Sequence, residues 1–137
     1  FRIATPDAKF GVPIARTLGK CLSAANVARL LAAFGRPRVE RLLLLADLVA
    51  APEALACGYL YEMAEASAIE ASTARLCQRL SGLAPVTQQV SKETLNRLLR
   101  SDLPDTEDLI RQAYGSDDFR EGVQAFVGKR APVWRGR

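Results

Sequence analysis

The spacing of hydrophobic residues changes along the chain. Residues 1–5 alternate weakly and carry β-favouring side chains, and a Pro6-Asp7 turn separates them from a second extended segment over Lys9–Gly11. Farther on, apolar residues recur every three or four positions, which is the period of a helix with one buried stripe. This change predicts alternating strands and helices up to about residue 65, followed by helices alone.

The first half contains start and stop signals for helices. Ser23 is the expected N-cap of a helix over Ala24–Phe34, and Gly35 closes it. The apolar face predicted for this helix comprises Val27, Leu30, Leu31 and Phe34. The other elements expected here are a helix from Pro37 to about Leu45, a connector over Asp47–Ala51 with a brief extended piece, a short helix over Pro52–Ala56 and a strand over Tyr59–Glu62.

Four helices in succession are expected in the second half. Ser67 and Glu70 have the spacing of a capping box, and the helix they begin runs to about Leu80. The inward residues predicted for this helix are Ile69, Thr73, Leu76 and Leu80. The next two helices are expected from Pro85 to about Arg100 and from Pro104 to Gly115.

The last helix is predicted to be amphipathic. Its apolar stripe comprises Phe119, Val123, Phe126 and Val127. Asp118 and Glu121 form the expected capping pair at its start, Lys129 and Arg130 are placed in its last turn, and Pro132 stops it. A stripe of this kind must pack on something, which is either the core of this chain or another subunit.

Composition narrows the class of protein. The chain has 137 residues, of which 49% are hydrophobic and 25% charged, as is typical of one soluble globular domain. Its longest apolar run, Leu42–Ala46, is far too short for a membrane span, and no signal peptide is visible. Because the chain begins at Phe1 rather than Met, we expect it to be a piece of something longer.

Side-chain chemistry excludes several kinds of site. The sequence contains no histidine, so a Ser-His-Asp or Cys-His nucleophile and a His-ligated zinc are excluded within it. Three widely spaced cysteines without a CxxC pair are expected to be reduced, and no metal site is expected. A net charge of +4 without interleaved aromatics argues against nucleic-acid binding. A solvated face, or attraction for an anion such as a CoA phosphate, is expected of the clustered Arg29, Arg36, Arg38 and Arg41.

Three stretches together resemble one known family. The final stretch, Ser116–Trp134, contains an acidic pair, then Phe-Arg-Glu-Gly, Ala-Phe, Lys-Arg and Pro. This order resembles the C-terminus of the enoyl-CoA hydratase/isomerase (crotonase) superfamily. Ala4–Pro13 is similar to a strand-and-turn segment from the middle of that family's chain. Arg41–Leu60 is similar to its helix, loop and helix-to-strand turn.

The resemblance implies a fold and an assembly. The fold class is α/β, with residues 1–65 as the end of a crotonase-like ββα spiral and residues 66–137 as a C-terminal helical trimerisation domain. The implied partners are an acyl-CoA thioester and further copies of the chain, as a homotrimer or a dimer of trimers (a hexamer), with neither nucleic acid nor membrane. Coenzyme A would enter only as part of the substrate, without a separate cofactor, and the location would be cytoplasmic, in fatty acid metabolism.

The resemblance also implies a chemistry for the full-length protein. In the family, two backbone N–H groups stabilise a thioester enolate, and each such donor can contribute about 3–4 kcal/mol. One of these donors and the first glutamate come from residues that precede Phe1, so this segment alone is expected to carry no catalytic residue. The second hydratase glutamate follows the proline of the Phe-Gly-x-Pro segment, where this chain has Ile14. An isoleucine cannot transfer a proton, so two-glutamate hydration is disfavoured.

The resemblance assigns a substrate-binding set to this chain. Its members are Phe10, Pro13, Ile14, Leu18, Phe126 and Lys129. Phe126 and Lys129 match positions that touch CoA in the site of a neighbouring subunit, although a packed phenylalanine and a solvated lysine are the plainer interpretation. Near Ile14, only Asp7 and Arg16 could substitute for a missing carboxylate, and solvated loop residues are expected at both positions.

Three functions therefore compete at the level of sequence. The first is an enoyl-CoA hydratase/isomerase-type enzyme, a lyase or isomerase, for which a one-base enolate reaction suits Ile14 better than hydration. The second is a non-catalytic acyl-CoA-binding or scaffolding homologue, and the third is a helical interaction module unrelated to CoA.

Overall fold

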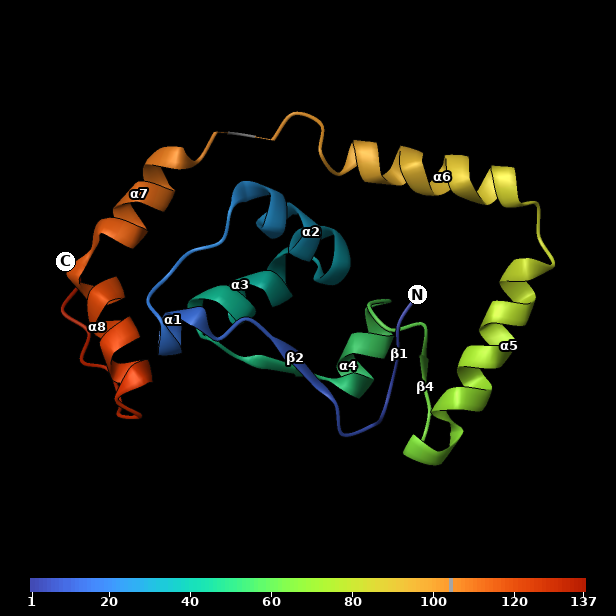
Figure 1. The fold of residues 1–137 in the computed structure, drawn as a ribbon, viewed down its shortest axis with the longest axis horizontal. Helices are drawn as coiled ribbons and strands as arrows, with labels where there is room; N and C mark the ends of the chain where they lie inside the picture. The colour runs from blue at the N-terminus through green and yellow to red at the C-terminus, as the bar shows by residue number, and fades with distance from the viewer. Residues whose placement is uncertain (104) are drawn as a thin grey trace.

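The computed structural model describes residues 1–103 and 105–137, and Figure 1 shows a small α/β core framed by an arch of helices. The strands are β1 (Ile3–Ala4), β2 (Lys9–Gly11), β3 (Leu48–Ala50) and β4 (Glu62–Met63). The helices are α1 (Ile14–Thr17), α2 (Ala24–Phe34), α3 (Arg36–Leu44), α4 (Ala51–Ala56), the 3-10 turn η1 (Ala66–Ala68), α5 (Ile69–Ser81), α6 (Pro85–Leu98), α7 (Glu107–Gly115) and α8 (Asp117–Val127). Among the described residues, all strands precede residue 65 and all elements after it are helical.

The strands form two separate pairs. β1 pairs in parallel with β4, and because parallel strands need a long crossover, everything from β2 to α4 lies between them in the sequence. β2 pairs antiparallel with β3, with Phe10 opposite Val49. The Ala51 N–H donates to the Ala8 carbonyl at 2.9 Å and extends this pairing to the start of α4. The segment after β2 is thereby fixed at the edge of the core.

The core lies under β2, β3 and the helices α2 to α4. Its buried side chains are Phe34, Val39, Leu42, Val49, Ala51, Ala54 and Leu60. Tyr59 joins this core from its edge, stacking on Phe34 with ring centroids 4.1 Å apart and meeting Phe10 edge-to-face at 5.1 Å. Aromatic pairs in these arrangements add stability beyond the area that they bury. The packing ties β2 to the loop before β4.

The first half confirms most local predictions and corrects one. The helix predicted over Ala24–Phe34 has those bounds, and Ser23 occupies its N-cap position, but within the described chain its side chain makes no capping hydrogen bond. The strand predicted over Tyr59–Glu62 is wrong, since β4 covers only Glu62–Met63. Gly58 has a φ of +80°, and the Leu60 N–H returns to the Ala54 carbonyl, so this stretch forms the turn that ends α4.

The start and the inward face of α5 also differ from the prediction. The helix begins at Ile69 after η1, and within the described residues no side chain caps it, so the Ser67–Glu70 capping box is wrong. Thr73 was predicted to face inward, but the buried residue is its neighbour Ser72. Thr73 instead lies exposed, and its hydroxyl donates to the Ile69 carbonyl one turn earlier. Periodicity identified the correct side of the helix but missed the buried position by one residue.

The arch carries an exposed apolar surface. The exposed side chains on α6 and directly after it are Val86, Val90, Leu95, Leu98 and Leu99. α6 runs along the top of Figure 1 between α5 and α7, away from the core. The helix start predicted at Pro104 lies outside the described residues, and α7 begins at Glu107. None of the helices described here is both long and apolar enough to span a bilayer.

Candidate functional site

The short helix α1 directly follows β2 and holds Ile14 in place by its backbone. Pro13 occupies the N-cap position, and the Ile14 N–H donates to the Val12 carbonyl at 2.8 Å. The Ile14 carbonyl accepts from both the Leu18 N–H at 3.0 Å and the Gly19 N–H at 2.8 Å. Ile14 is half-buried, and its aliphatic side chain can line a pocket but cannot donate or accept a proton.

Phe10 is both a packing residue and a cavity-lining residue. Its ring meets Tyr59, as described above, and it borders a cavity of about 290 Å³. The cavity is lined by Lys9, Phe10, Gly11, Val12, Leu30, Phe34, Leu42 and Tyr59. The backbone of β2 thus joins a small cavity at Phe10 to the α1 segment at Pro13 and Ile14.

Leu18 lies where α1 meets α8. A Cβ placed on Gly122 would come within 2.5 Å of the Leu18 carbonyl oxygen and 2.6 Å of its carbonyl carbon. This separation is possible only because Gly122 has no side chain. Ala125, one turn later on α8, is fully buried. The packed face of α8 therefore consists of small residues, of which Gly122 lies on the backbone of Leu18.

Phe126 and Lys129 lie beyond this contact and are exposed in the single chain. Phe126 is 69% exposed, and Lys129 follows the end of α8 with a φ of +50°. α8 ends at Val127 with Gly128 as its C-cap, so Lys129 is not in its last turn and Pro132 does not stop it, contrary to the prediction. The helix ends earlier because the Arg130 N–H reaches back to the Ala125 carbonyl across this turn.

The predicted apolar stripe of α8 is not its packed face. Val123 and Val127 are 40% and 77% exposed, and only Phe119 of the stripe is half-buried, against Tyr114 of α7 with centroids 4.7 Å apart. The sequence left open whether the core of this chain or another subunit covers this stripe. In the structure, the core of this chain does not cover it.

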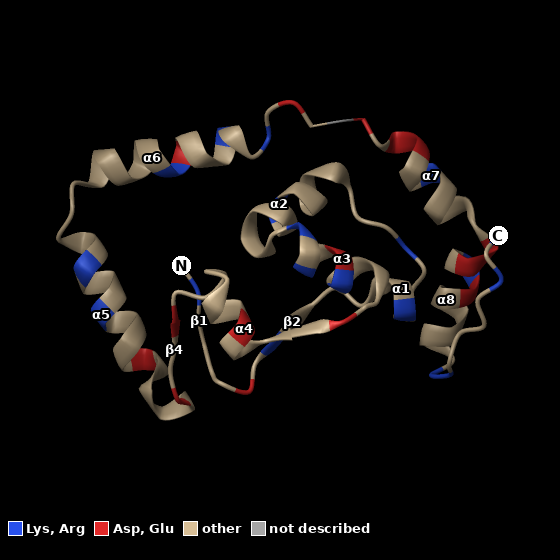
Figure 2. Cartoon of the chain, turned by 180° about the vertical axis from the view of Figure 1, so that it is seen from behind, with Lys and Arg blue, Asp and Glu red and all other residues tan. Residues whose placement is uncertain are grey.

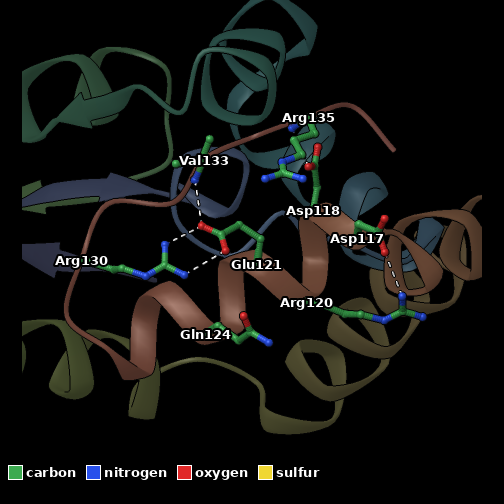
Figure 3. Close-up of a pocket in the computed structure, with 8 residues that line it drawn as sticks. All are labelled: Asp117, Asp118, Arg120, Glu121, Gln124, Arg130, Val133 and Arg135. Atoms are coloured by element: carbon green, nitrogen blue, oxygen red, sulfur yellow. Dashed lines mark hydrogen bonds and ion pairs between the residues drawn. The ribbon is translucent and has the colours of Figure 1, made fainter.

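The acidic residues of α8 bind the segment that follows this helix (residues 128–137, here called the tail) rather than the start of the helix. The capping side chain is Ser116, whose Oγ accepts from the Phe119 N–H at 3.0 Å, so the predicted Asp118–Glu121 capping pair is wrong. Glu121 instead accepts from the Arg130 guanidinium and from the Val133 N–H at 2.9 Å (Figure 3). The cavity of about 410 Å³ between α8 and the tail is lined by Asp117, Asp118, Arg120, Glu121, Gln124, Arg130, Val133 and Arg135.

The Glu121 carboxyl has a strongly lowered pKa. The Arg130 hydrogen bonds, followed by the Val133 N–H, lower the pKa of Glu121 from 4.5 to about 2. A pKa that is lower in the folded state stabilises the fold above the unfolded value, and this contribution is lost as the pH falls through the folded value. The attachment of the tail through Glu121 is therefore complete above about pH 4.5 and lost towards pH 2.

Arg130→Ala should raise the pKa of Glu121 towards 4.5, because it removes the largest cause of the shift. The measurement is a carboxyl carbon titration by NMR. Arg135→Ala is the control, since Arg135 is the weakest of the causes and its removal should leave the pKa near 2. An unchanged Glu121 pKa in Arg130→Ala would show that this ion pair does not form in solution.

The arginine cluster is largely neutralised within the chain. Each of its members has a polar partner: Arg29 with Asn26, Arg36 with Glu40 at 2.8 Å, Arg38 with Glu53 at 2.9 Å and Arg41 with Asp47 at 3.2 Å. Figure 2 shows both signs of charge on α3 and on α8. This pairing supports the solvated face over an anion site, and across the described residues no three Cys, Asp or Glu side chains gather as metal ligands.

The two groups named as substitutes for a carboxylate at Ile14 face solvent. Arg16 is exposed on α1, and Asp7 is exposed in the turn between β1 and β2. The Thr5 hydroxyl hydrogen-bonds to Asp7 and lowers the pKa of that carboxyl, which favours its ionised form. Their exposure agrees with the expectation of solvated loop residues.

Sequence reasoning missed the residues that join α8 and the tail to α1. They are Gly19, Asp118, Gly122 and Trp134. A third cavity of about 760 Å³ adjoins α1 and includes Ala15, Gly19, Ser116 and Trp134 in its lining. The available signal was Gly122, because a glycine inside an amphipathic helix costs stability unless a close approach requires it.

Known proteins share this fold over nearly the whole chain. The solved structure of methylmalonyl-CoA decarboxylase in complex with 2-nitronate-propionyl-CoA matches with a TM-score of 0.89 and 28% identity, covering 98% of this chain and 54% of that one. A carnitinyl-CoA dehydratase from Mycobacterium avium 104 matches with a TM-score of 0.82 and 30% identity, covering 98% of this chain and 55% of that one.

Curated relatives give the same result at the level of sequence. Short-chain-enoyl-CoA hydratase of Clostridium acetobutylicum is 27% identical over 94% of this chain and 51% of its own length. Across its curated relatives, the chain spans about half of their length. The profile of the family described as enoyl-CoA hydratase/isomerase matches residues 1–137. The chain therefore belongs to the enoyl-CoA hydratase/isomerase family, as its resemblance to the crotonases implied.

Proposed function

We propose that the full-length protein processes an acyl-CoA thioester by stabilising its enolate. The observation that carries this proposal is the fold, which matches enzymes named for acyl-CoA substrates over 98% of this chain. A thioester enolate needs hydrogen-bond donors aimed at its oxygen, and positioned donors are usually the largest single contribution to such catalysis. In this proposal, β2 and α1 present Pro13, Ile14 and Leu18 to the acyl group.

Ile14 narrows the reaction. Hydration requires one group to activate water and another to protonate carbon, and a positioned acid or base contributes roughly 100- to 10,000-fold. Isomerisation of an enoyl thioester needs only one proton-transferring group, so it tolerates an aliphatic side chain at this position. We therefore place a one-base enolate reaction ahead of hydration.

Decarboxylation is a second form of the same proposal. A 2-carboxyacyl thioester loses CO₂ when its C–C bond breaks, and the electron pair of that bond becomes the enolate, which then takes a proton at C2 from water. No protein base removes a proton in this step. The similarity to a protein named methylmalonyl-CoA decarboxylase, 31% identical over 72% of this chain and 40% of that protein, favours testing it.

The other candidate is a non-catalytic acyl-CoA-binding or scaffolding homologue. Loss of the carboxylate at Ile14 supports it equally well, because binding requires no proton transfer. In either case we propose an assembly of at least three copies, and the exposed stripe Val123, Phe126 and Val127 supports this as a surface that another subunit could cover.

Turnover of three substrates by the full-length protein separates these possibilities. Crotonyl-CoA reports hydration, a 3-enoyl-CoA reports isomerisation and methylmalonyl-CoA reports decarboxylation. We expect turnover of the 3-enoyl or the methylmalonyl thioester to exceed hydration of crotonyl-CoA. Acyl-CoA binding without turnover of any substrate would favour the scaffolding homologue, and failure to bind any acyl-CoA would refute both.

Lys129→Ala should weaken binding of acyl-CoA to the full-length protein by about tenfold, the lower end of the loss expected for one hydrogen bond to a charged group. Its ammonium is exposed after α8, where it could reach a CoA phosphate in a neighbouring subunit. Lys92→Ala on α6 is the matched control and should bind as the wild type does. Calorimetric affinities that are equal in the two variants would remove Lys129 from the site.

A further inference from the structure

The tail after α8 folds back along this helix and is tied to its first turn. The Asp118 carboxylate accepts from two successive tail amides, the Arg135 N–H at 2.7 Å and the Gly136 N–H at 2.8 Å. The Asp118 N–H donates to the Arg137 backbone oxygen at 3.1 Å, and Figure 3 shows Asp118 next to Arg135. Hydrogen bonds to a carboxylate are stronger than those between neutral groups.

A second tie lies one turn further along α8. Glu121 receives the Val133 N–H at 2.9 Å and the Arg130 Nη2 at 2.9 Å. Trp134 lies between these two sets of hydrogen bonds. Its neighbours on both sides donate their backbone N–H groups to α8 carboxylates. The backbone of Trp134 is therefore fixed from both directions, although the residue itself remains 38% exposed.

The indole of Trp134 lies against Gly19, at the end of the α1 segment. A Cβ on Gly19 would come within 3.1 Å of the indole Cζ3 and within 3.1 Å of the Asp118 carbonyl oxygen. Gly19 also has a φ of +62°, a backbone conformation that residues with side chains rarely adopt. The backbone conformation favours glycine strongly here, and a side chain at this position would also crowd the indole, so the contact depends on Gly19.

The backbone of Gly19 connects Trp134 to Ile14. Its N–H donates to the Ile14 carbonyl at 2.8 Å, and that carbonyl is the acceptor that closes α1. The order of contacts is therefore Trp134 ring, Gly19 backbone, Ile14 backbone. A shift of Gly19 would alter the hydrogen bond that sets the position of Ile14.

We infer that Trp134 is a positioning residue, which holds the α1 segment, and with it Ile14, in the geometry that orients the bound acyl thioester for reaction. The role at Ile14 rests on the proposed function, but the contact between Trp134 and Gly19 does not. Trp134 acts through Gly19 and touches no reacting atom. The tail thus becomes part of the site although it lies 120 positions from Ile14 in the sequence.

The test compares three variants of the full-length protein by amide hydrogen exchange and by kinetics. In Trp134→Ala, the Leu18 and Gly19 amides should exchange about tenfold faster, while amides of the β2–β3 pair keep their rates. In Trp134→Phe, the ring is retained and exchange should return towards the wild-type rate. The matched control is Val133→Ala, whose exposed side chain belongs to the same tail but whose N–H still reaches Glu121.

The kinetic part uses whichever of the three thioesters the wild type turns over. Trp134→Ala should lower kcat by about tenfold with a smaller change in KM, since misplacing a group near the reacting atoms reduces turnover more than binding. Exchange at Leu18 and Gly19 that is unchanged, or that rises equally throughout the core, would overturn the inference. If exchange responds locally but the wild type neither binds nor turns over an acyl-CoA, the proposed function fails while the contact stands.

Discussion

Ile14→Glu in the full-length protein is expected to raise hydration of crotonyl-CoA by about 100- to 10,000-fold, the contribution of one positioned general acid or base. Ile14 occupies the position of the second hydratase glutamate by resemblance, directly after Pro13. Its backbone is already fixed by hydrogen bonds from Leu18 and Gly19, so the new carboxylate would extend from a defined point. The measurement is the rate of loss of the enoyl absorbance.

Ile14→Gln is the matched control for this substitution. A glutamine has nearly the same shape as the glutamate and is also polar, but it is uncharged and cannot transfer a proton at neutral pH. Hydration should therefore rise in Ile14→Glu alone. Equal rates in the two variants, with both proteins folded and binding acyl-CoA, would mean that this position does not face the reacting carbons.

Gly122→Ala is expected to lower the free energy of unfolding by about 3 kcal/mol, the upper end of the usual cost of overpacking. The added methyl group would lie 2.5 Å from the Leu18 carbonyl oxygen, and the atoms that it meets are backbone rather than the end of a flexible side chain. α8 must then move away from the α1 segment. Denaturant unfolding monitored by circular dichroism measures the loss.

The control for Gly122→Ala is Gly115→Ala at the end of α7. No atom beyond the neighbouring residues lies within 4 Å of a Cβ at Gly115 in the described structure. This substitution should therefore stabilise the protein by about 0.4–1 kcal/mol, because it reduces the freedom of the unfolded chain. If both glycine variants have the same stability, the contact of α8 with Leu18 is not formed in solution.

Local signals predicted the elements of the first half well. Ser23 and Gly35 bracket the helix over Ala24–Phe34, and the structure has these bounds. The signals are sufficient because helix ends depend on the residues next to them. The strand predicted at Tyr59 was wrong because an aromatic residue after a glycine suits either a strand or a packed turn, and the stacking on Phe34 decided the outcome.

Long-range partners account for the errors in the last helix. Asp118 and Glu121 have the spacing of capping residues, but they bind tail amides that lie 12 to 18 positions away. A carboxylate accepts equally well from a helix start and from a folded-back chain, so the sequence alone cannot distinguish the two. The residue that caps the helix is Ser116, which lies close to these acidic residues. The prediction chose the acidic residues instead.

Only part of the predicted substrate-binding set lies together in the structure. β2 connects Phe10 to Pro13 and Ile14, and Leu18 lies under α8, so the structure brings four of the six predicted residues into one continuous region. Phe126 and Lys129 are exposed, and their role depends on a second subunit that periodicity cannot specify. The proposed contribution of Trp134 was invisible because it depends on how the tail folds back.

The most direct test of the central claim is a crystal structure of the full-length protein with a bound, unreactive acyl-CoA thioester. The account predicts that the Ile14 side chain contacts the acyl group beside the thioester, with no carboxylate of residues 1–137 within hydrogen-bonding distance of the reacting carbons. A thioester bound away from α1, or a carboxylate of this chain positioned against those carbons, would contradict it.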